Sequence, residues 1–441
     1  MGAPWKRAVV TERCTAANPV LRPDGPTLRH RASRDNPNAP AEPAVPGALF
    51  CNRMVFVKIT RRQFEKIAAA TAIASSVRQA RAAAAYTGPL DGFEDKVKME
   101  DFDPVRYTLG LHDAAPMELA FKPGTRRQTE LWQKKLSAKV TELLGGFPKQ
   151  PAPLNPKTLE VRDFPGYRRE KFVFESRPGL PVLGYLLLPK AAKTPVATAI
   201  CIPGHGRGVD DIVGVDPQGQ DRTQKVTYEF DFAIQAVEQG LAAVAIEPMG
   251  FGCRRDARNK AKGLEQKACE PVAGAALLLG QTMIGWRVWD VMRTVDWIGT
   301  RPELDAQRVG CIGISGGGTV SLFSAALEPR IKAAMVSGYL NTFRSSVMSI
   351  GHCIDNYVPG ILNWAEMYDV AGLIAPRPLF SEAGEMDSIF PIAASKESFQ
   401  KVKAVYEVFG AGAEAQQETF PGPHSFWGKK GVPFMAEKLR G

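Results

Sequence analysis

The sequence RVGCIGISGGGTVSLFSAALEP, residues 308–329, surrounds one serine, Ser315, with glycines between two apolar runs. The first run is typical of a buried strand and the second of a helix, so Ser315 lies at a sharp strand-to-helix turn. Residues 313–317 read G-x-S-x-G, which in this context indicates a nucleophile elbow. Such an elbow needs glycines because strained backbone angles project the serine oxygen and neighbouring side chains would clash. The stretch therefore predicts a nucleophilic serine at the carboxyl end of a strand rather than a flexible turn.

Short β-branched apolar runs alternate with longer helical patterns from about residue 160, as in a parallel sheet covered by helices on both faces. Predicted strands are 180–189, 196–204, 241–249, 308–315, 331–340, 377–384 and 415–422; predicted helices lie near 224–239, 274–299, 317–327, 391–408 and 432–440. We therefore expect an α/β catalytic domain over residues 160–441. Residues 86–159, with an amphipathic helix at 126–146, are interpreted as an N-terminal helical extension. Residues 341–375, between two strands, are interpreted as a small cap insertion.

A serine hydroxyl needs a base to attack at neutral pH, and a histidine oriented by a carboxylate is the usual one. Where the nucleophile sits on such an elbow, the acid and then the histidine follow it along the chain. His424, in a loop after the last predicted strand, meets this order, and His352 in the insertion is the second choice. Asp387 follows the strand 377–384 and is the predicted acid. Glu382 and Glu385 are its rivals, of which Glu385 is the more serious.

An oxyanion hole needs two backbone N–H groups aimed at the charge that develops on the substrate oxygen. The amide of Gly316, directly after the nucleophile, is one predicted donor. The loop CIPGHGRG (201–208) supplies the other, from Gly206 or Arg207. His205 in this loop is interpreted as structural, because no acidic or cysteine residue accompanies it at the spacing of metal ligands. The chain also has no C-x-x-C pair, so we expect neither a metal nor an organic cofactor.

Substrate contacts are predicted from residue type and from position near strand ends or in the insertion. Aromatic rings stack on sugars, and guanidinium groups hold carboxylates. The predicted substrate-binding residues are His352, Trp364, Trp427, Arg254 and Arg255, with Arg344 as a further carboxylate-binding candidate.

The basic character of the chain belongs to its first 85 residues, which carry 14 of the 56 Lys and Arg but 5 of the 46 Asp and Glu. The remainder is nearly neutral, which argues against a nucleic-acid partner. The stretch ITRRQFEKIAAATAIASSVRQARAAAAY (59–86) resembles a twin-arginine export signal and is too short and weakly apolar for a membrane span. We expect a signal peptide at 54–85, recognised by the twin-arginine translocation machinery, and a periplasmic or secreted protein. Residues 1–53 are then a gene-model extension before a true start at Met54. The sequence does not decide whether Cys253 and Cys269 form a disulfide.

Several motifs together resemble the α/β-hydrolase group that includes acetyl xylan esterase-like and dienelactone hydrolase-like proteins. They are PGHGRG (203–208), PMGFGCRRD (248–256), GWRVWDVMRTVDWI (285–298), GISGGG (313–318), HCIDNYVPGI (352–361), IAPRPLF (374–380), GEMDSIFP (384–391) and PHSFW (423–427). The resemblance covers roughly residues 160–440 and implies ester hydrolysis through Ser315, Asp387 and His424. Two positions differ: Gly316 stands where acetyl xylan esterases usually carry glutamine, and dienelactone hydrolases use cysteine where this chain has Ser315.

The predicted function is a serine esterase that cleaves carboxylic esters through an acyl-enzyme. Its expected substrates are acetyl or other esters of plant polysaccharide, or small-molecule esters. A peptidase of the prolyl-oligopeptidase type is the first alternative, although no repeat of β-propeller length precedes the catalytic domain. A non-catalytic ligand-binding homologue of the fold is the second, against which the presence of Ser315, Asp387 and His424 argues.

Overall fold

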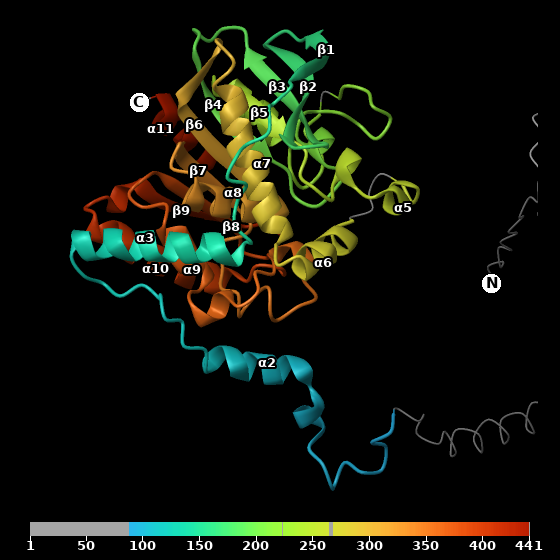
Figure 1. Ribbon diagram of the computed structural model, residues 1–441, viewed down its shortest axis with the longest axis vertical. Helices are drawn as coiled ribbons and strands as arrows, with labels where there is room; N and C mark the ends of the chain where they lie inside the picture. Colours follow the sequence, from blue (N-terminus) through green and yellow to red (C-terminus); the bar gives the residue numbers. More distant parts are fainter. Residues whose placement is uncertain (1–87, 223, 264–267, 441) are drawn as a thin grey trace, which may run out of the picture. The chain divides into compact units, whose positions relative to one another are not determined.

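A nine-stranded mixed sheet forms the centre of the computed structural model, which describes residues 88–222, 224–263 and 268–440 (Figure 1). The strands lie in the order β1-β2-β3-β5-β4-β6-β7-β8-β9. They are β1 (Lys157–Asp163), β2 (Tyr167–Arg177), β3 (Leu180–Pro189), β4 (Val196–Ile202), β5 (Ala242–Ile246), β6 (Leu304–Ile314), β7 (Ile331–Ser337), β8 (Leu379–Gly384) and β9 (Ala415–Phe420). Strands β1 to β3 pair antiparallel, as does β3 with β5, whereas the six strands from β5 to β9 in the sheet order are parallel. The mostly parallel α/β sheet predicted from the sequence is confirmed.

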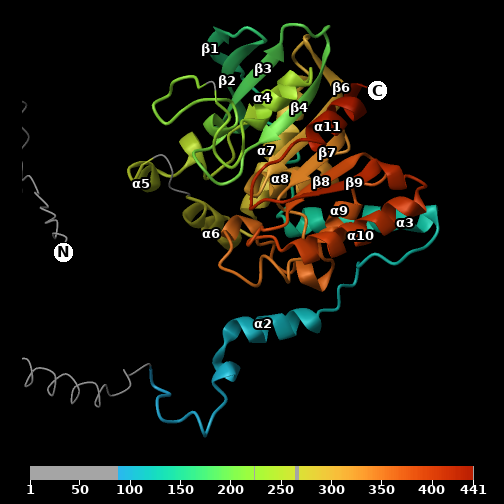
Figure 2. The ribbon, with the colours of Figure 1, turned by 180° about the vertical axis from the view of Figure 1, so that it is seen from behind.

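Helices cover both faces of this sheet (Figures 1 and 2). One face packs against α3 (Arg126–Leu143), α7 (Met283–Ile298), α8 (Gly316–Leu327), α9 (Met367–Gly372) and α10 (Ile392–Val408). The other packs against α4 (Phe232–Glu238) and α11 (Gly431–Arg440). The remaining helices are η1 (Met99–Phe102), α2 (Pro104–Asp113), η2 (Val209–Asp211), η3 (Gly252–Arg254), α5 (Ala257–Lys260), α6 (Glu270–Leu278), η4 (Ile354–Asn356), η5 (Ile361–Asn363) and η6 (Gly412–Glu414). No helix of these described residues has the length and apolarity that a membrane crossing requires.

Strand β4 illustrates why the central strands read as continuous apolar runs. All seven of its residues are buried. Ala199 and Cys201 join the core on the α4 and α11 side, while Ile200 and Ile202 join the core on the α7 and α8 side. Successive side chains of a strand point to opposite faces, so a strand covered on both faces is apolar at nearly every position. The exception in β4 is Thr198, whose hydroxyl donates to the carbonyl oxygen of Val196 at 3.1 Å.

Most predicted elements are found with small shifts at their ends, and three features differ. The helix predicted near 224–239 is helical only as α4 from Phe232, because the backbone at Thr227, Phe230 and Asp231 has positive φ. The predicted helix 274–299 is two helices, α6 and α7, because Thr282 caps a new helix by accepting a hydrogen bond from the amide of Gly285. The hairpin of β1 and β2 was not predicted. β1 begins inside the predicted extension, and its pattern is almost wholly exposed, so it lacks the alternation that identifies a half-buried strand. The predicted signal peptide at 54–85 and the segment 1–53 lie outside the described residues.

The carboxyl ends of the parallel strands bring distant loops to one edge of the sheet, where ligands bind in such folds. The turn after β6 holds Ser315, the loop after β4 holds His205, and the loops after β8 and β9 hold Asp387 and His424. The segment 341–375 follows β7 and contains η4, η5 and α9. The three predicted catalytic residues, Ser315, Asp387 and His424, therefore lie at the same edge of the sheet.

Candidate active site

Ser315 occupies a strained turn between β6 and α8. Its backbone angles are φ 55° and ψ −121°, an arrangement that residues with side chains rarely adopt. Its amide donates to the carbonyl oxygen of Ser337 on β7 at 3.0 Å, which fixes the turn to the sheet. A Cβ atom on Gly317 would lie 1.9 Å from the carbonyl oxygen of Ile202, and one on Gly313 would lie 2.3 Å from that of Gly317. The glycines thus permit close backbone packing around the serine.

The start of helix α8 presents backbone donors beside Ser315. Gly316 is the first residue of the helix, so its N–H has no intrahelical acceptor. A Cβ atom there would meet the ring of His205 at 2.9 Å, so only glycine fits between the helix and the loop after β4. The helix dipole adds positive potential at the same point.

His424 and Asp387 form a hydrogen-bonded pair. Nδ1 of His424 lies 2.7 Å from Oδ2 of Asp387. The other carboxylate oxygen accepts hydrogen bonds from the amides of Ile389 and Phe390 at 2.8 and 3.0 Å, so the carboxylate is held from both sides. With Nδ1–H donating to Asp387, Nε2 of His424 is left as a proton acceptor. Nε2 is buried and has no hydrogen-bond partner among the described residues.

The two rival acids have other positions. Glu382 is buried and accepts hydrogen bonds from the Ser337 hydroxyl at 2.7 Å and from the amides of Trp427 and Gly428 at 2.9 Å each. Burial raises the pKa of Glu382 to about 7. It anchors the loop that carries His424 to the sheet. Glu385 is exposed and lies 3.4 Å from the Thr419 hydroxyl.

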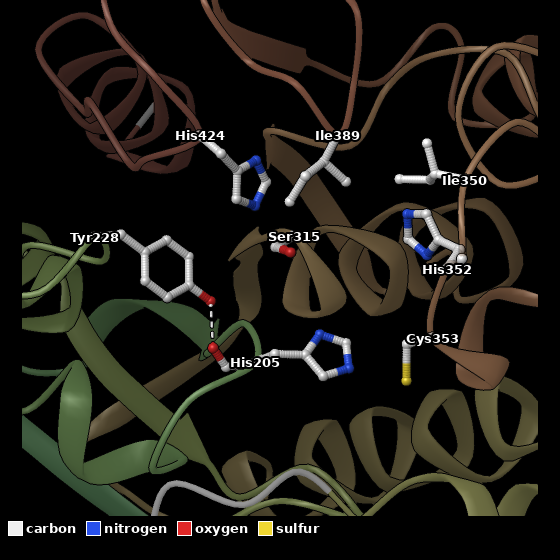
Figure 3. Close-up of a pocket in the computed structure, with 9 residues that line it drawn as sticks. His205, Tyr228, Ser315, Ile350, His352, Cys353, Ile389 and His424 are labelled. Carbon is white, nitrogen blue, oxygen red and sulfur yellow. Dashed lines mark hydrogen bonds between the residues drawn. The ribbon is translucent and has the colours of Figure 1, made fainter. Parts of the chain in front are cut away.

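Ser315 and His424 line one cavity of about 400 Å³ (Figure 3). Its other lining residues are His205, Tyr228, Ile350, Gly351, His352, Cys353 and Ile389. The Tyr228 ring stacks on His424 with centroids 5.8 Å apart, and its hydroxyl donates to the His205 carbonyl at 2.9 Å. Tyr228 therefore contacts both His424 and the loop after β4. The cavity wall is mainly apolar, and its polar groups include the hydroxyls of Ser315 and Tyr228 and the three imidazole rings.

Only His352 of the five predicted substrate-binding residues lines this cavity. Arg254 pairs with Asp290 at 2.6 Å, and Arg255 donates to backbone carbonyls of its own loop. Trp364 lies under the Lys139 ammonium group, 4.2 Å from its ring centroid, and Trp427 stacks on Phe420 at 5.0 Å. The further candidate Arg344 pairs with Asp113 at 2.9 Å. These side chains have other protein partners and do not line this cavity, and their contact with substrate stays a prediction.

The loop after β4 offers fewer oxyanion donors than the sequence suggests. The amide of Arg207 donates to Oδ2 of Asp211 at 2.8 Å, so it is not available to a substrate oxygen in this arrangement. The amide of Gly204 likewise donates to Glu229 at 2.6 Å. Of the two donors predicted in this loop, the amide of Gly206 remains available. The amide of His205, which also lies between the engaged amides of Gly204 and Arg207, is a further candidate oxyanion donor.

His205 has partners that sequence reasoning missed. Its Nε2 lies 3.2 Å from Oδ2 of Asp355 and 3.8 Å from Sγ of Cys269. Arg287 donates to the same Asp355 oxygen at 2.5 Å. Burial alone would raise the pKa of Asp355, but this guanidinium and the His205 ring hold it well below its usual range. The partners come from distant segments, so no local spacing could have revealed them. Both Cys253 and Cys269 are free thiols, the former exposed and the latter buried.

The strand order, with the serine elbow after β6 and the histidine loop after β9, defines an α/β-hydrolase fold. The chain belongs to the Abhydrolase family, whose model matches residues 108–421. A curated relative, "Putative hydrolase YtaP" of Bacillus subtilis (strain 168), is 25% identical over 276 residues, which cover 61% of this chain and 86% of the relative.

Two solved structures illustrate the shared fold. A "putative acetyl xylan esterase" from Bacteroides fragilis NCTC 9343 aligns with a TM-score of 0.63 and 21% identity, over 74% of this chain and 84% of that chain. A glucuronoyl esterase from Solibacter usitatus aligns with a TM-score of 0.57 and 15% identity, over 74% and 98% of the two chains. The protein is thus a member of a hydrolase family whose structural neighbours include carbohydrate esterases.

Proposed function

We propose that this protein is a serine esterase that cleaves carboxylic esters through an acyl-enzyme on Ser315. One observation carries the proposal. Nε2 of His424 has no partner among the described residues and belongs to a ring that shares the cavity with Ser315, while Asp387 holds the opposite ring nitrogen at 2.7 Å. A base, its orienting acid and a strained serine are the groups that acyl transfer requires.

In the first step, the Ser315 oxygen attacks the ester carbonyl carbon as Nε2 of His424 takes the hydroxyl proton. The hydroxyl is not hydrogen-bonded to Nε2 in the structure, so this hydrogen bond must form when substrate binds. Catalytic hydrogen bonds commonly close only in the substrate complex. The tetrahedral intermediate then expels the alcohol, which receives the proton from His424. Water, activated by the same imidazole, cleaves the acyl-enzyme and regenerates the serine.

The oxyanion of the tetrahedral intermediate needs fixed donors, and two places supply them. The Gly316 amide at the start of α8 is one. The second is an amide of the loop after β4, from Gly206 or His205, because the flanking amides are engaged by Glu229 and Asp211. Donors of this kind contribute several kcal/mol to the transition state, about 3–4 for a single one.

The proposed substrates are short, uncharged acyl esters, among them acetyl or other esters of plant polysaccharide. Ile350 and Ile389 form apolar parts of the cavity wall, and no guanidinium or ammonium group is among its described lining residues. An acyl group without charge matches such a wall. The structural neighbour named as an acetyl xylan esterase is consistent with a carbohydrate alcohol, whereas the glucuronoyl esterase is named for a carbohydrate acyl group.

We also propose export by the twin-arginine route, on the motif at 59–66. Fractionation of cells that produce the full chain should place the processed protein in the periplasm or the medium. Replacing Arg61 and Arg62 together by lysine should retain it in the cytoplasm. Unchanged export of that variant would contradict the proposal. N-terminal sequencing of the precursor decides whether synthesis begins at Met54.

Hydrolysis of p-nitrophenyl acetate, compared with that of an aminoacyl p-nitroanilide, tests the reaction class. We expect cleavage of the ester and little or none of the anilide; the reverse preference would indicate a peptidase. Ser315→Ala should lower activity on the order of 10⁴-fold or more if the triad acts as a unit. Ser425→Ala, which removes a hydroxyl that donates to the Pro423 carbonyl, is the matched control and should remain active. A fluorophosphonate probe should label Ser315, and no labelling together with no hydrolysis would favour the non-catalytic alternative.

A further inference from the structure

Four side chains with metal-binding atoms meet beside the active-site cavity. They are His205 after β4, Cys269 at the start of α6, and Cys353 and Asp355 at η4. One ligand atom from each lies within 4.8 Å of all the others. Figure 3 shows the ring of His205 and the sulfur of Cys353 side by side, below Ser315. The proposed ester hydrolysis uses none of these four side chains.

The spacing of these atoms matches that of tetrahedral zinc ligands. Nε2 of His205 and Oδ2 of Asp355 are 3.2 Å apart, and Sγ of Cys269 lies 3.8 Å from the former and 3.6 Å from the latter. Zinc bonds of about 2.3 Å to sulfur and about 2.0–2.1 Å to nitrogen or oxygen place neighbouring tetrahedral ligands roughly 3.3 Å apart for N and O, and roughly 3.6 Å apart for S and either. These three distances agree with the tetrahedral values, and Sγ of Cys353 lies within 4.8 Å of the other three ligand atoms.

Burial and charge fit the same ion. The side chains are buried: Cys269, Cys353 and Asp355 are 0%, 8% and 2% exposed. Water therefore solvates their charged forms poorly. Two thiolates and a carboxylate carry three negative charges. A divalent cation would leave one negative charge. The buried guanidinium of Arg287 balances this charge, because its nitrogens lie 2.5 Å from Asp355 Oδ2 and 3.4 Å from Cys269 Sγ. Buried charges persist when they are paired in this way or bind metal.

The remaining contacts resemble the outer shell of a metal site. Oδ1 of Asp355 accepts a hydrogen bond from the Asn356 side chain at 2.8 Å, which orients the carboxylate so that Oδ2 faces the cluster. Arg287 is itself fixed through bonds to the Met249 carbonyl at 2.5 and 3.0 Å. Such outer partners hold ligands in position before the ion arrives.

We propose that His205, Cys269, Cys353 and Asp355 bind one structural zinc ion. Four protein ligands complete a tetrahedral shell and leave no open position for substrate or water, as in structural rather than catalytic zinc sites. The ion joins the loop after β4, the start of α6 and the segment at η4. Because the His205 ring also packs against Gly316, the ion steadies the loop that faces the nucleophile.

Metal analysis of the untagged full chain, purified under reducing conditions, tests the proposal. We expect about one zinc ion per chain. Removal of the zinc by a strong chelator should lower the melting temperature, and adding zinc back should restore it. Cobalt in place of zinc should give the intense thiolate-to-metal absorption of a tetrahedral site with sulfur ligands. The double variant Cys269→Ser, Cys353→Ser should lose bound zinc to the background level. Cys253→Ser, which alters an exposed thiol outside the cluster, is the matched control and should keep it.

Three results would overturn the proposal. One is a reduced wild-type chain that binds neither zinc nor cobalt after exchange. The second is equal metal content in the double variant and the control. The third is a disulfide between Cys269 and Cys353 found by peptide mass analysis of the freshly isolated protein. If the double variant does not fold, the cobalt spectrum of the wild-type chain decides alone, because it needs no substitution. None of these measurements uses esterase activity, so they stand apart from the test of the proposed function.

Discussion

Asp387 holds His424 through a 2.7 Å hydrogen bond from Nδ1 to Oδ2, and is itself held by two backbone amides on its other oxygen. Asp387→Asn would place an amide group against Nδ1 and favour the tautomer with the proton on Nε2, where it cannot accept one from Ser315. Loss of the orienting carboxylate in a Ser-His-Asp triad lowers kcat by about 10⁴-fold. We expect a fall of that order in kcat for p-nitrophenyl acetate.

Glu385→Gln is the control for this experiment, because Glu385 is the nearest rival acid in the chain and its side chain is exposed. It should retain near wild-type kcat. A large fall with Glu385→Gln and a small one with Asp387→Asn would show that the acid is misassigned. Thermal melting of both variants separates a catalytic loss from unfolding.

Close packing at the serine turn makes a second prediction about stability. A Cβ atom on Gly317 would lie 1.9 Å from the carbonyl oxygen of Ile202, so Gly317→Ala must displace helix α8 from β4. Forced overpacking of this kind costs about 1–3 kcal/mol and occasionally more. We expect the free energy of unfolding in urea to fall by at least that amount.

Gly274→Ala is the matched control, because Gly274 is also helical and a Cβ atom there meets nothing within 4 Å. Alanine should raise stability by about 0.5–1 kcal/mol, since glycine loses more conformational freedom in a helix. If Gly317→Ala were as stable as Gly274→Ala, the backbone contact at the elbow would have no energetic importance.

The fold was predictable because both faces of the central strands are covered, so that β4 and the second half of β6, residues 309–314, read as mainly apolar runs. The positions of Ser315, Asp387 and His424 were predicted from the strand pattern, the G-x-S-x-G turn and the order of the three residues along the chain. The residues that line the cavity could not be predicted in the same way. Arg254 comes after a strand end like a pocket residue, but Asp290 on α7 holds its guanidinium at 2.6 Å, and sequence gives no measure of that approach.

The cluster around His205 could not be predicted for a related reason. Its ligand atoms come from three loops, and Cys269 and Asp355 reach His205 only because β4, α6 and η4 are assembled by the fold. Metal spacing in sequence is recognisable when ligands are close neighbours along the chain. Here the side chains come from segments far apart in the sequence and are close together only in the folded protein.

Burial of Glu382 predicts a dependence of stability on pH. Its pKa rises from 4.5 to about 7 in the folded protein because the carboxyl is removed from water. Between these values the folded state keeps a proton that the unfolded state has lost. The contribution of Glu382 is therefore full below pH 4.5 and is lost as the pH rises to about 7.

Glu382→Gln removes this titration while keeping the size of the side chain. The difference in unfolding free energy between wild type and variant should decline across this window, by roughly 3 kcal/mol at most for such a shift. Urea unfolding at pH 4.5, 6 and 7.5 measures it. A difference that stays constant, or grows with pH, would mean that Glu382 is ionised in the folded protein.

The side chain of Ile389 sets the size of the acyl site if the cavity binds the ester as proposed. Ile389→Ala keeps the backbone amide that bonds to Asp387 and removes apolar volume from the cavity wall. The ratio of kcat/KM for p-nitrophenyl butyrate to that for the acetate should rise about 10-fold or more, because each methylene in an apolar pocket contributes about 1–3 kcal/mol. Ile361→Ala, a buried isoleucine in the same region that does not line the cavity, should lower stability without changing this ratio. The ratio compares two substrates on the same enzyme preparation, so a loss of folded protein does not change it. An equal change of the ratio in Ile389→Ala and Ile361→Ala would mean that the acyl group does not contact Ile389.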